Sequence, residues 1–339
     1  LSPLNQLAEY VKWYKTDFAL MAQMGINTIR VNQDFGTGAD AIKILDELWR
    51  QGIKVIVRVD FPVGGSQGDL ANVSAVVNAY KHHPAVLMWS VGSLWDINRY
   101  GNKFSTIGDA AAFTEQAAQL IKSLDSFHPV TTEIGDPHEL GSHVLSAEAF
   151  PYLMEPYCTN NWYCVSVSTE DMVNTLVSSV DVWGITPNRG DTFQDALDQW
   201  RSITDKPAYI AQWGVGTRGL VYVDEDNKSQ VNGQMWDEVY FELSAERTNG
   251  TLVGAFAHTW NNNTDVAGVG LVDINRNPSP AYTALQSRFK DPVNGVQMNA
   301  NPVITVTSRG NESVEINGKV MFKRGGGGKG ARGINVFVF

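Results

Sequence analysis

Cysteine and positive charge are both scarce in this sequence. Only Cys158 and Cys164 occur among 339 residues, six apart in "CTNNWYC", and no metal-ligand pattern lies beside them. We interpret the pair as a small disulfide loop, with two free thiols as the alternative. With 26 Lys plus Arg against 36 Asp plus Glu, the formal charge is -10, and the predicted pI is about 5.1. This balance argues against a surface that neutralises nucleic-acid phosphates.

Long apolar runs, phosphate loops and metal-binding spacings are also missing. No uncharged apolar run approaches the ~18–20 residues of a membrane helix. The glycine run in "KRGGGGKGARG" lacks the Gly-Lys-Ser/Thr ending of a phosphate loop. His82 and His83 stand at an expected helix end, and we interpret His258, on an expected strand, as a core residue. We therefore expect no metal, no cofactor, no nucleic-acid partner and no membrane span.

Two features, the cysteine pair and a set of N-glycosylation patterns, favour a secreted or cell-surface location. The chain begins at Leu1 without the charged and then apolar start of a signal peptide, so we expect a mature product or a segment of a longer protein. Acceptor patterns for N-glycosylation occur at Asn72, Asn227, Asn249, Asn262 and Asn311. Together with the cysteine pair, these patterns indicate an extracellular glycoprotein.

Helix and strand signals alternate along most of the chain. Thr16 or Asp17 can cap a first helix that Gly25 ends, and the strand "INTIRV" follows it. Further short apolar strands are "IKVIVRV", "AVLMWSVG", "PVTTEIG", "VDVWGI", "PAYIAQW" and "LVGAFAHTW", each after an amphipathic stretch. Nearly all-apolar strands separated by helices predict a parallel sheet that is covered on both faces.

The α/β pattern predicts a (β/α)₈ TIM barrel with one strand missing. Seven strands are legible where eight are needed, and the chain opens in what would be the first helix, so we expect the first strand to lie upstream. A doubly wound open sheet is the alternative, although no glycine-rich turn follows the first strand. The pattern stops near residue 290. Residues 291–302 are a turn-rich linker, and residues 303–339 alternate as a small β-rich module would.

Polar and aromatic residues gather at the predicted strand ends, where a parallel barrel carries its functional groups. These ends hold Arg30, Asn32, Arg58, Asp60, Trp89, Ser93, Leu94, Trp95, Glu133, Asp136, Trp183, Thr186, Asn188, Gln212, Trp213, Thr259, Trp260 and Asn261. Indole rings stack on the apolar faces of sugars, and amides and guanidinium groups bond hydroxyls. We therefore expect a sugar-binding cleft, while the alternative is that each tryptophan fills the core between barrel and helices.

Several stretches resemble a known enzyme clan. "FALMAQMGINTIRVN", "KHHPAVLMWSVG", "VDVWGI", "DKPAYIAQWG" and "GLVDINRNPSPAYTALQ", between about residues 10 and 289, resemble the retaining glycoside hydrolase barrels that include family 2 β-glycosidases and glucanosyltransferases. The resemblance implies that strand four ends in Asn-Glu, the Glu being the general acid/base. It also implies that strand seven ends in the nucleophilic Glu.

This sequence departs from the clan at both catalytic positions. Ser93 and Leu94 stand in place of the Asn-Glu pair, and Gln212 stands in place of the nucleophile. Retaining hydrolysis needs two carboxyl groups about 5 Å apart. Leucine cannot carry the proton, and a neutral amide is a poor nucleophile, so losing either carboxyl removes orders of magnitude in rate.

The C-terminal residues carry a second resemblance. "ITVTSRGNESVEINGKVMFKRGGGGKGARGINVFVF" resembles the start of the interleukin-like EMT inducer or PANDER-like module, through "INGK", "RG" and "INV" in this order. That resemblance implies a secreted, compact β-rich domain without a transferable catalytic residue. The alternative is an unrelated β-hairpin domain.

We therefore predict a barrel over residues 1–290 that has lost its catalytic carboxylates and has a carbohydrate-binding or structural role in an extracellular assembly. Its partners would be a glycan and other subunits of that assembly. The expected binding residues are Arg30, Asn32, Trp89, Ser93, Trp95, Glu133, Trp183, Asn188, Gln212, Trp213 and Trp260. The rival is an active β-glycosidase or transglycosylase that uses Glu133 with Asp96 or Asp60. A third possibility is a purely structural barrel whose pocket is filled by its own Cys158–Cys164 segment.

Overall fold

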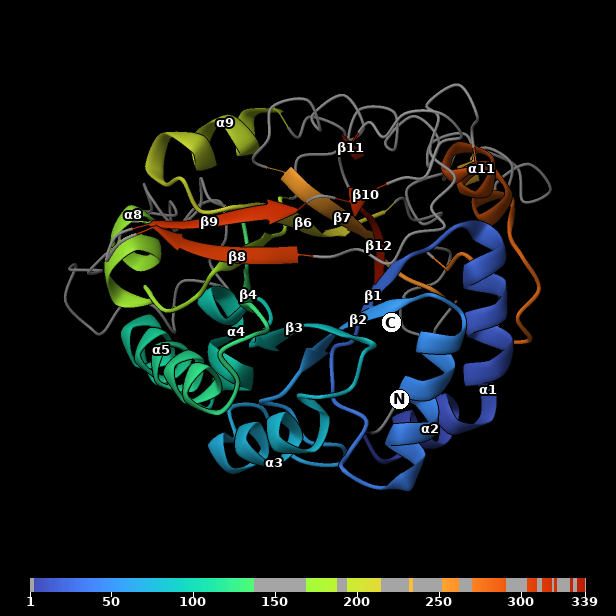
Figure 1. Cartoon of the computed structure of the whole chain (residues 1–339), viewed down its shortest axis with the longest axis horizontal. Coiled ribbons are helices and arrows are strands. Elements are labelled where there is room, and N and C mark those ends of the chain that lie inside the picture. Colours follow the sequence, from blue (N-terminus) through green and yellow to red (C-terminus); the bar gives the residue numbers. More distant parts are fainter. Residues whose placement is uncertain are drawn as a thin grey trace, which may run out of the picture.

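A ring of parallel strands forms the centre of the computed structural model. The structure describes residues 3–136, 169–187, 194–214, 232–233, 252–261 and 270–290, and five strands between residues 304 and 338. The ring contains β1 (Thr28–Arg30), β2 (Lys54–Arg58), β3 (Val86–Val91), β4 (Val130–Ile134), β5 (Val182–Ile185), β6 (Ala208–Trp213), β7 (Leu252–Ala257) and β12 (Ile334–Val338). The closed order is β1-β12-β7-β6-β5-β4-β3-β2, which confirms the predicted α/β barrel (Figure 1).

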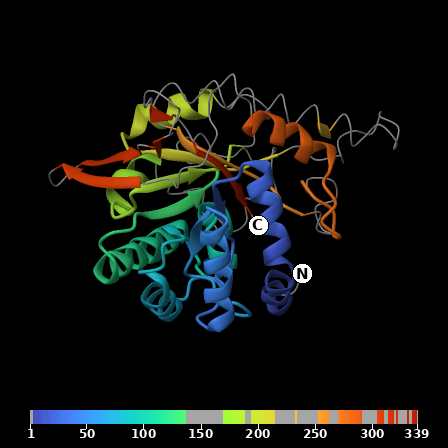
Figure 2. The same ribbon diagram turned by 45° about the vertical axis from the view of Figure 1, so that its right-hand side comes forward.

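Helices cover the outside of this ring (Figure 2). They are α1 (Pro3–Met24), α2 (Ala39–Arg50), α3 (Leu70–Tyr80), α4 (Trp95–Asn102), α5 (Ile107–Leu124), α8 (Thr169–Asp171), the π-helical turn η1 (Met172–Leu176), α9 (Gln194–Ile203) and α11 (Pro280–Phe289). Among the described helices, none is long and apolar enough to cross a membrane.

Strand β12 occupies the place of the strand that the sequence left missing. It pairs in parallel with β1 on one side and with β7 on the other, through Val336 opposite both Thr28 and Phe256. The hairpin of β8 (Ile304–Arg309) and β9 (Ser313–Gly318) pairs antiparallel, and β10 (Val320–Met321) pairs with β11 (Gly330–Ala331). The separation of a module after a linker at residues 291–302 stays a prediction, since the linker lies outside the described residues.

Strand alternation sorts side chains into two cores. Outward residues such as Ile29, Val57 and Trp89 pack against the helices, because neighbouring residues on a strand face opposite sides. Inside the ring, Tyr209 lies against Gly184, where an added Cβ would come within 2.7 Å of the phenol ring. The Tyr209 hydroxyl accepts a hydrogen bond from Thr131 Oγ1 at 3.1 Å. The interior is therefore filled by side chains, as in other parallel barrels.

The first helix differs from the sequence-based expectation. It begins at Pro3, so Thr16 and Asp17 lie inside α1 and do not cap it. Asp17 instead accepts two hydrogen bonds from Arg276, from Nε at 2.9 Å and Nη2 at 3.2 Å, and Arg276 also stacks on Trp13. Burial raises the pKa of Asp17, against the lowering effect of Arg276. This ion pair joins α1 to the segment that follows β7.

Replacing Asp17 with asparagine is expected to destabilise the barrel strongly. Arg276 and Asp17 are almost fully buried, so the substitution leaves a buried cation without a counter-charge. We expect the free energy of unfolding to fall by about 3–5 kcal/mol, measured by urea denaturation. A loss below about 1 kcal/mol, as for a surface pair, would show that the Asp17–Arg276 contact is not a buried ion pair in solution.

Candidate functional site

Glu133 lies at the centre of the strand-end face and accepts hydrogen bonds from four different elements. Arg30 Nη1, at the end of β1, donates to Oε2 at 2.7 Å, and Ser93 Oγ, which follows β3, donates to the same oxygen. Thr186 Oγ1, after β5, donates to Oε1 at 2.9 Å, and Gln212 Nε2 on β6 donates to Oε1 at 2.7 Å. Each carboxylate oxygen thus has two donors, so the anion is paired and saturated.

Gln212 reaches this site because β6 is irregular. Tyr209 points into the ring, so strict alternation would turn Gln212 outward toward the helices. The pairing of β6 with β7 shifts register between Ile210 and Trp213, as a β-bulge does. A bulge re-aims the side chain beside it. The shift brings the Gln212 amide to Glu133, and the Gln212 side chain remains partly exposed.

Ser93 and Leu94 occupy the turn between β3 and α4. Gly92 precedes them with a φ of +72°, and its N–H donates to Asp60 Oδ1 at 2.8 Å. Leu94 adopts the left-handed conformation, with a φ of 50°, and α4 begins directly after it. Both side chains are partly exposed. The turn places a hydroxyl on Glu133 and an apolar side chain beside it.

His258 belongs to the site, although the sequence indicated a core residue. It follows β7 and is partly exposed. Burial, and after it the Arg30 cation, lower the pKa of His258, while Glu133 acts in the opposite direction. The imidazole is therefore neutral at neutral pH. Thr186 was noted at a strand end but was not among the expected binding residues; the signal for both was their position two residues after an inward-facing strand residue, Gly184 or Phe256.

A comparison with protein families identifies the barrel. The model described as "Glycosyl hydrolases family 2, TIM barrel domain" matches residues 66–293, which is more than half of the chain. The chain belongs to the glycosyl hydrolase family 2 TIM-barrel family. No curated protein sequence matches it significantly.

Solved structures share the fold of this family 2 barrel at low sequence identity. The Bacteroides uniformis β-glucuronidase 2, covalently bound to cyclophellitol-6-carboxylate aziridine, has a TM-score of 0.58 at 15% identity. The match covers 88% of this chain and 34% of that one. A family 1 β-glucosidase from Thermotoga maritima has a TM-score of 0.57 at 12% identity, covering 83% of this chain and 87% of that one. The chain thus spans about a third of the length of the first enzyme.

Four tryptophans that were expected to line a sugar-binding cleft are buried in this family 2 barrel and line no cleft. Trp89, Trp95, Trp183 and Trp260 are all 0% exposed. Trp89 Nε1 donates to Asp125 at 2.9 Å and Trp95 Nε1 to Thr132 at 2.7 Å, on the helix-facing side. Ring contacts join Trp183 to Trp200 of α9 and Trp260 to Tyr282 of α11. The sugar-stacking expectation was wrong for these four, because they fill the layer between strands and helices.

Trp213 is also buried, with 6% of its surface exposed. Quenching of tryptophan fluorescence is therefore a poor reporter of ligands at this site.

The two acids proposed as partners of Glu133 are held by other groups. Asp60 is fully buried and accepts from Arg58 Nε at 3.0 Å and from the N–H groups of Gly68 and Gly92. Asp96, in the first turn of α4, accepts from the Gly135 N–H at 3.0 and 3.1 Å. Both carboxylates hold loops against the barrel through these hydrogen bonds. No group of three His, Cys, Asp or Glu side chains forms a metal site within the described residues.

Several sequence-based predictions fall on residues that the structure does not describe. They concern Asn188, Cys158, Cys164, Asn227, Asn249, Asn262 and Asn311, which lie outside the described ranges. Asn72 is described, in the first turn of α3, and its side-chain nitrogen donates to Asp34 and to the carbonyl of Val59. That nitrogen is the atom a glycan would occupy, so in the folded chain Asn72 is a packing residue.

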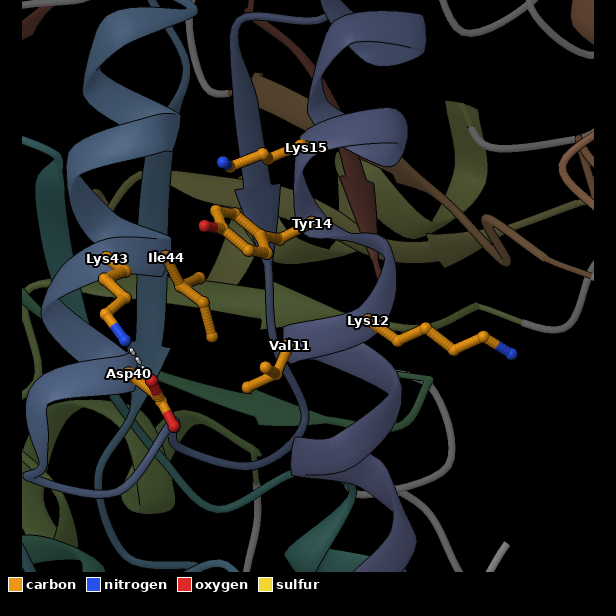
Figure 3. Close-up of a pocket in the computed structure, with 7 residues that line it drawn as sticks. All are labelled: Val11, Lys12, Tyr14, Lys15, Asp40, Lys43 and Ile44. Carbon is orange, nitrogen blue, oxygen red and sulfur yellow. Dashed lines mark hydrogen bonds and ion pairs between the residues drawn. The ribbon is translucent and has the colours of Figure 1, made fainter.

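A separate hollow of about 290 Å³ lies on the outer wall between α1 and α2 (Figure 3). Val11 and Ile44 face each other across it, and Lys43 pairs with Asp40 at its edge. None of its lining residues comes from a strand end. It is therefore distinct from the Glu133 site.

Proposed function

We propose that this family 2 barrel is catalytically inactive and binds carbohydrate at the Glu133 end of the strands. The observation that carries the proposal is the replacement of both carboxyl positions, by Leu94 and Gln212, around a single central carboxylate that is already saturated. Gln212 Nε2 donates a hydrogen bond to Glu133. The residue at the nucleophile position therefore helps to hold Glu133 in place.

Glu133 is poorly suited to either catalytic role. A general acid must deliver a proton to the leaving oxygen, whereas both oxygens of Glu133 already accept hydrogen bonds from other side chains of the protein. A nucleophile must reach the anomeric carbon, whereas Glu133 is 0% exposed. The rival proposal of a working β-glycosidase also needs a second acid, and Asp60 and Asp96 are bound to backbone N–H groups.

The binding role rests on partly exposed polar side chains at the Glu133 end of the strands. Ser93 and Gln212 bond Glu133, His258 is electrostatically coupled to it, and Asn32 follows β1 two residues after Arg30. Such converging polar groups are typical of sugar sites. A secreted or cell-surface location, N-linked glycans and a role within a larger assembly remain parts of the proposal that rest on the sequence alone.

Titration calorimetry with neutral β-linked oligosaccharides tests the binding proposal. We expect saturable binding, weakened about tenfold or more in Asn32→Ala, because losing one hydrogen bond to a ligand costs about 1.4 kcal/mol. Asn78→Ala is the matched control, since Asn78 is exposed on α3 and away from the strand ends. Equal affinities of Asn32→Ala and Asn78→Ala would place the glycan elsewhere. An absence of binding to any glycan would favour the purely structural barrel.

A further inference from the structure

We propose that the Glu133 site accepts neutral sugars and discriminates against sugars that carry a carboxylate or another anionic group. This inference rests on the proposed function, because it names the class of glycan at the same site. Its physical basis is a separation of charge among the residues that the structure describes: two ion pairs are buried beneath the site, and the partly exposed side chains at the strand ends are neutral.

The buried layer holds compensated charges. Arg30 pairs with Glu133, and both side chains are 0% exposed. Arg58 pairs with Asp60, at 3% and 0% exposure. Because both guanidinium groups are buried and already paired with a carboxylate, a ligand's carboxylate that stays outside this layer cannot reach either cation.

Within the described ranges, the accessible layer at the strand ends is made of neutral side chains. Asn32, Ser93, Leu94, Gln212 and His258 are each partly exposed. The lowered pKa of His258 keeps this imidazole uncharged at neutral pH.

This layer offers hydrogen-bond acceptors to hydroxyl donors. Gln212 Nε2 donates one of its two hydrogens to Glu133, and the Gln212 carbonyl oxygen can accept from a ligand. Ser93 likewise uses its hydroxyl proton on Glu133. Acceptor oxygens bind sugar hydroxyls and repel carboxylates, which are acceptors only.

The test compares matched sugars that differ only at C6. Titration calorimetry would measure p-nitrophenyl β-glucoside against p-nitrophenyl β-glucuronide, and the galactoside against the galacturonide. We expect the neutral member of at least one pair to bind about tenfold or more tightly, with an affinity that changes less than about twofold between roughly 20 and 300 mM NaCl. Leu94→Lys, which adds a cation in the accessible layer, should raise the affinity for the uronide.

Three outcomes separate this inference from the proposed function. Equal or tighter binding of the uronides by the unaltered chain overturns the neutral-sugar inference and leaves carbohydrate binding intact. A folded Leu94→Lys variant that binds the uronides no more tightly than the unaltered chain contradicts the assignment of Leu94 to the accessible layer. Absence of binding by all four sugars and by the neutral oligosaccharides overturns both proposals.

Discussion

Replacing Glu133 with alanine is expected to lower the free energy of unfolding by about 3–5 kcal/mol, the range found when one partner of a buried ion pair is removed. Arg30 would remain inside the barrel at 0% exposure without its counter-charge. Ser93, Thr186 and Gln212 would also lose the acceptor of their hydrogen bonds. Urea denaturation followed by far-ultraviolet circular dichroism measures the change, provided that the slope of the transition stays constant.

Asp40→Ala is the matched control for this substitution. Asp40 and Lys43 make an ion pair with the same 2.7 Å separation as Arg30 and Glu133, but their side chains are 51% and 62% exposed. Removing such an exposed pair costs between about 0 and 1 kcal/mol. Similar losses in Glu133→Ala and Asp40→Ala would mean that water reaches the Glu133 site freely, and the account of a saturated, buried carboxylate would be wrong.

Placing a carboxylate at residue 212, where the family resemblance implies a nucleophilic Glu, is expected to destabilise the chain. Gln212→Glu would place a second acid where the amide now donates to Glu133 Oε1 at 2.7 Å. Two carboxylates at this distance cannot both ionise cheaply, so one folded-state pKa rises. When the pKa of an acid is higher in the folded than in the unfolded state, the folded protein keeps its stability at low pH. That stability is lost as the pH rises through the folded-state pKa. At 1.36 kcal/mol per unit, a rise of about two units removes about 2–3 kcal/mol above pH 7.

Gln119→Glu provides the same chemical change at the surface. Gln119 Nε2 donates to Glu115 Oε1 at 2.8 Å, one turn apart on α5, and the contact is exposed. We expect a change of a few tenths of a kcal/mol there, with little dependence on pH. A Gln212→Glu variant as stable at pH 8 as at pH 5 would show that residue 212 does not contact Glu133 in solution.

The seven strands from β1 to β7 could be predicted because each is a short β-branched or apolar run buried on both faces. "IKVIVRV" and "PVTTEIG", for example, contain β2 and β4. The place of β12 could not be predicted in the same way. It depends on pairing with β1 and β7, far away in the sequence, and nothing local in "INVFVF" selects those partners. The start of α1 was missed because Asp17 has good capping chemistry, while its real contact, Arg276, is 259 residues away.

The site shows the same division between local and distant information. Glu133 was recognisable as an acid at the end of a predicted strand, and Ser93, Leu94 and Gln212 were recognisable from the family pattern. The tryptophans were placed wrongly because a strand-end position does not say which face a side chain takes. Counting every second residue from Arg30 or Glu133 identifies the side chains that face inward on the same strand. The bulge that turns Gln212 inward cannot be found in this way, because it depends on the pairing of β6 with β7.

The most direct test of the central claim is the rate at which the purified chain hydrolyses aryl β-glycosides, compared with Glu133→Gln under the same conditions. Glutamine keeps the shape of residue 133 and removes its charge, so it isolates a catalytic role of the carboxylate. The account predicts release of nitrophenol at the uncatalysed rate by both proteins, across gluco, galacto and manno configurations. Turnover by the unaltered chain that disappears in a folded Glu133→Gln variant would contradict it, and would establish Glu133 as part of a relocated active site.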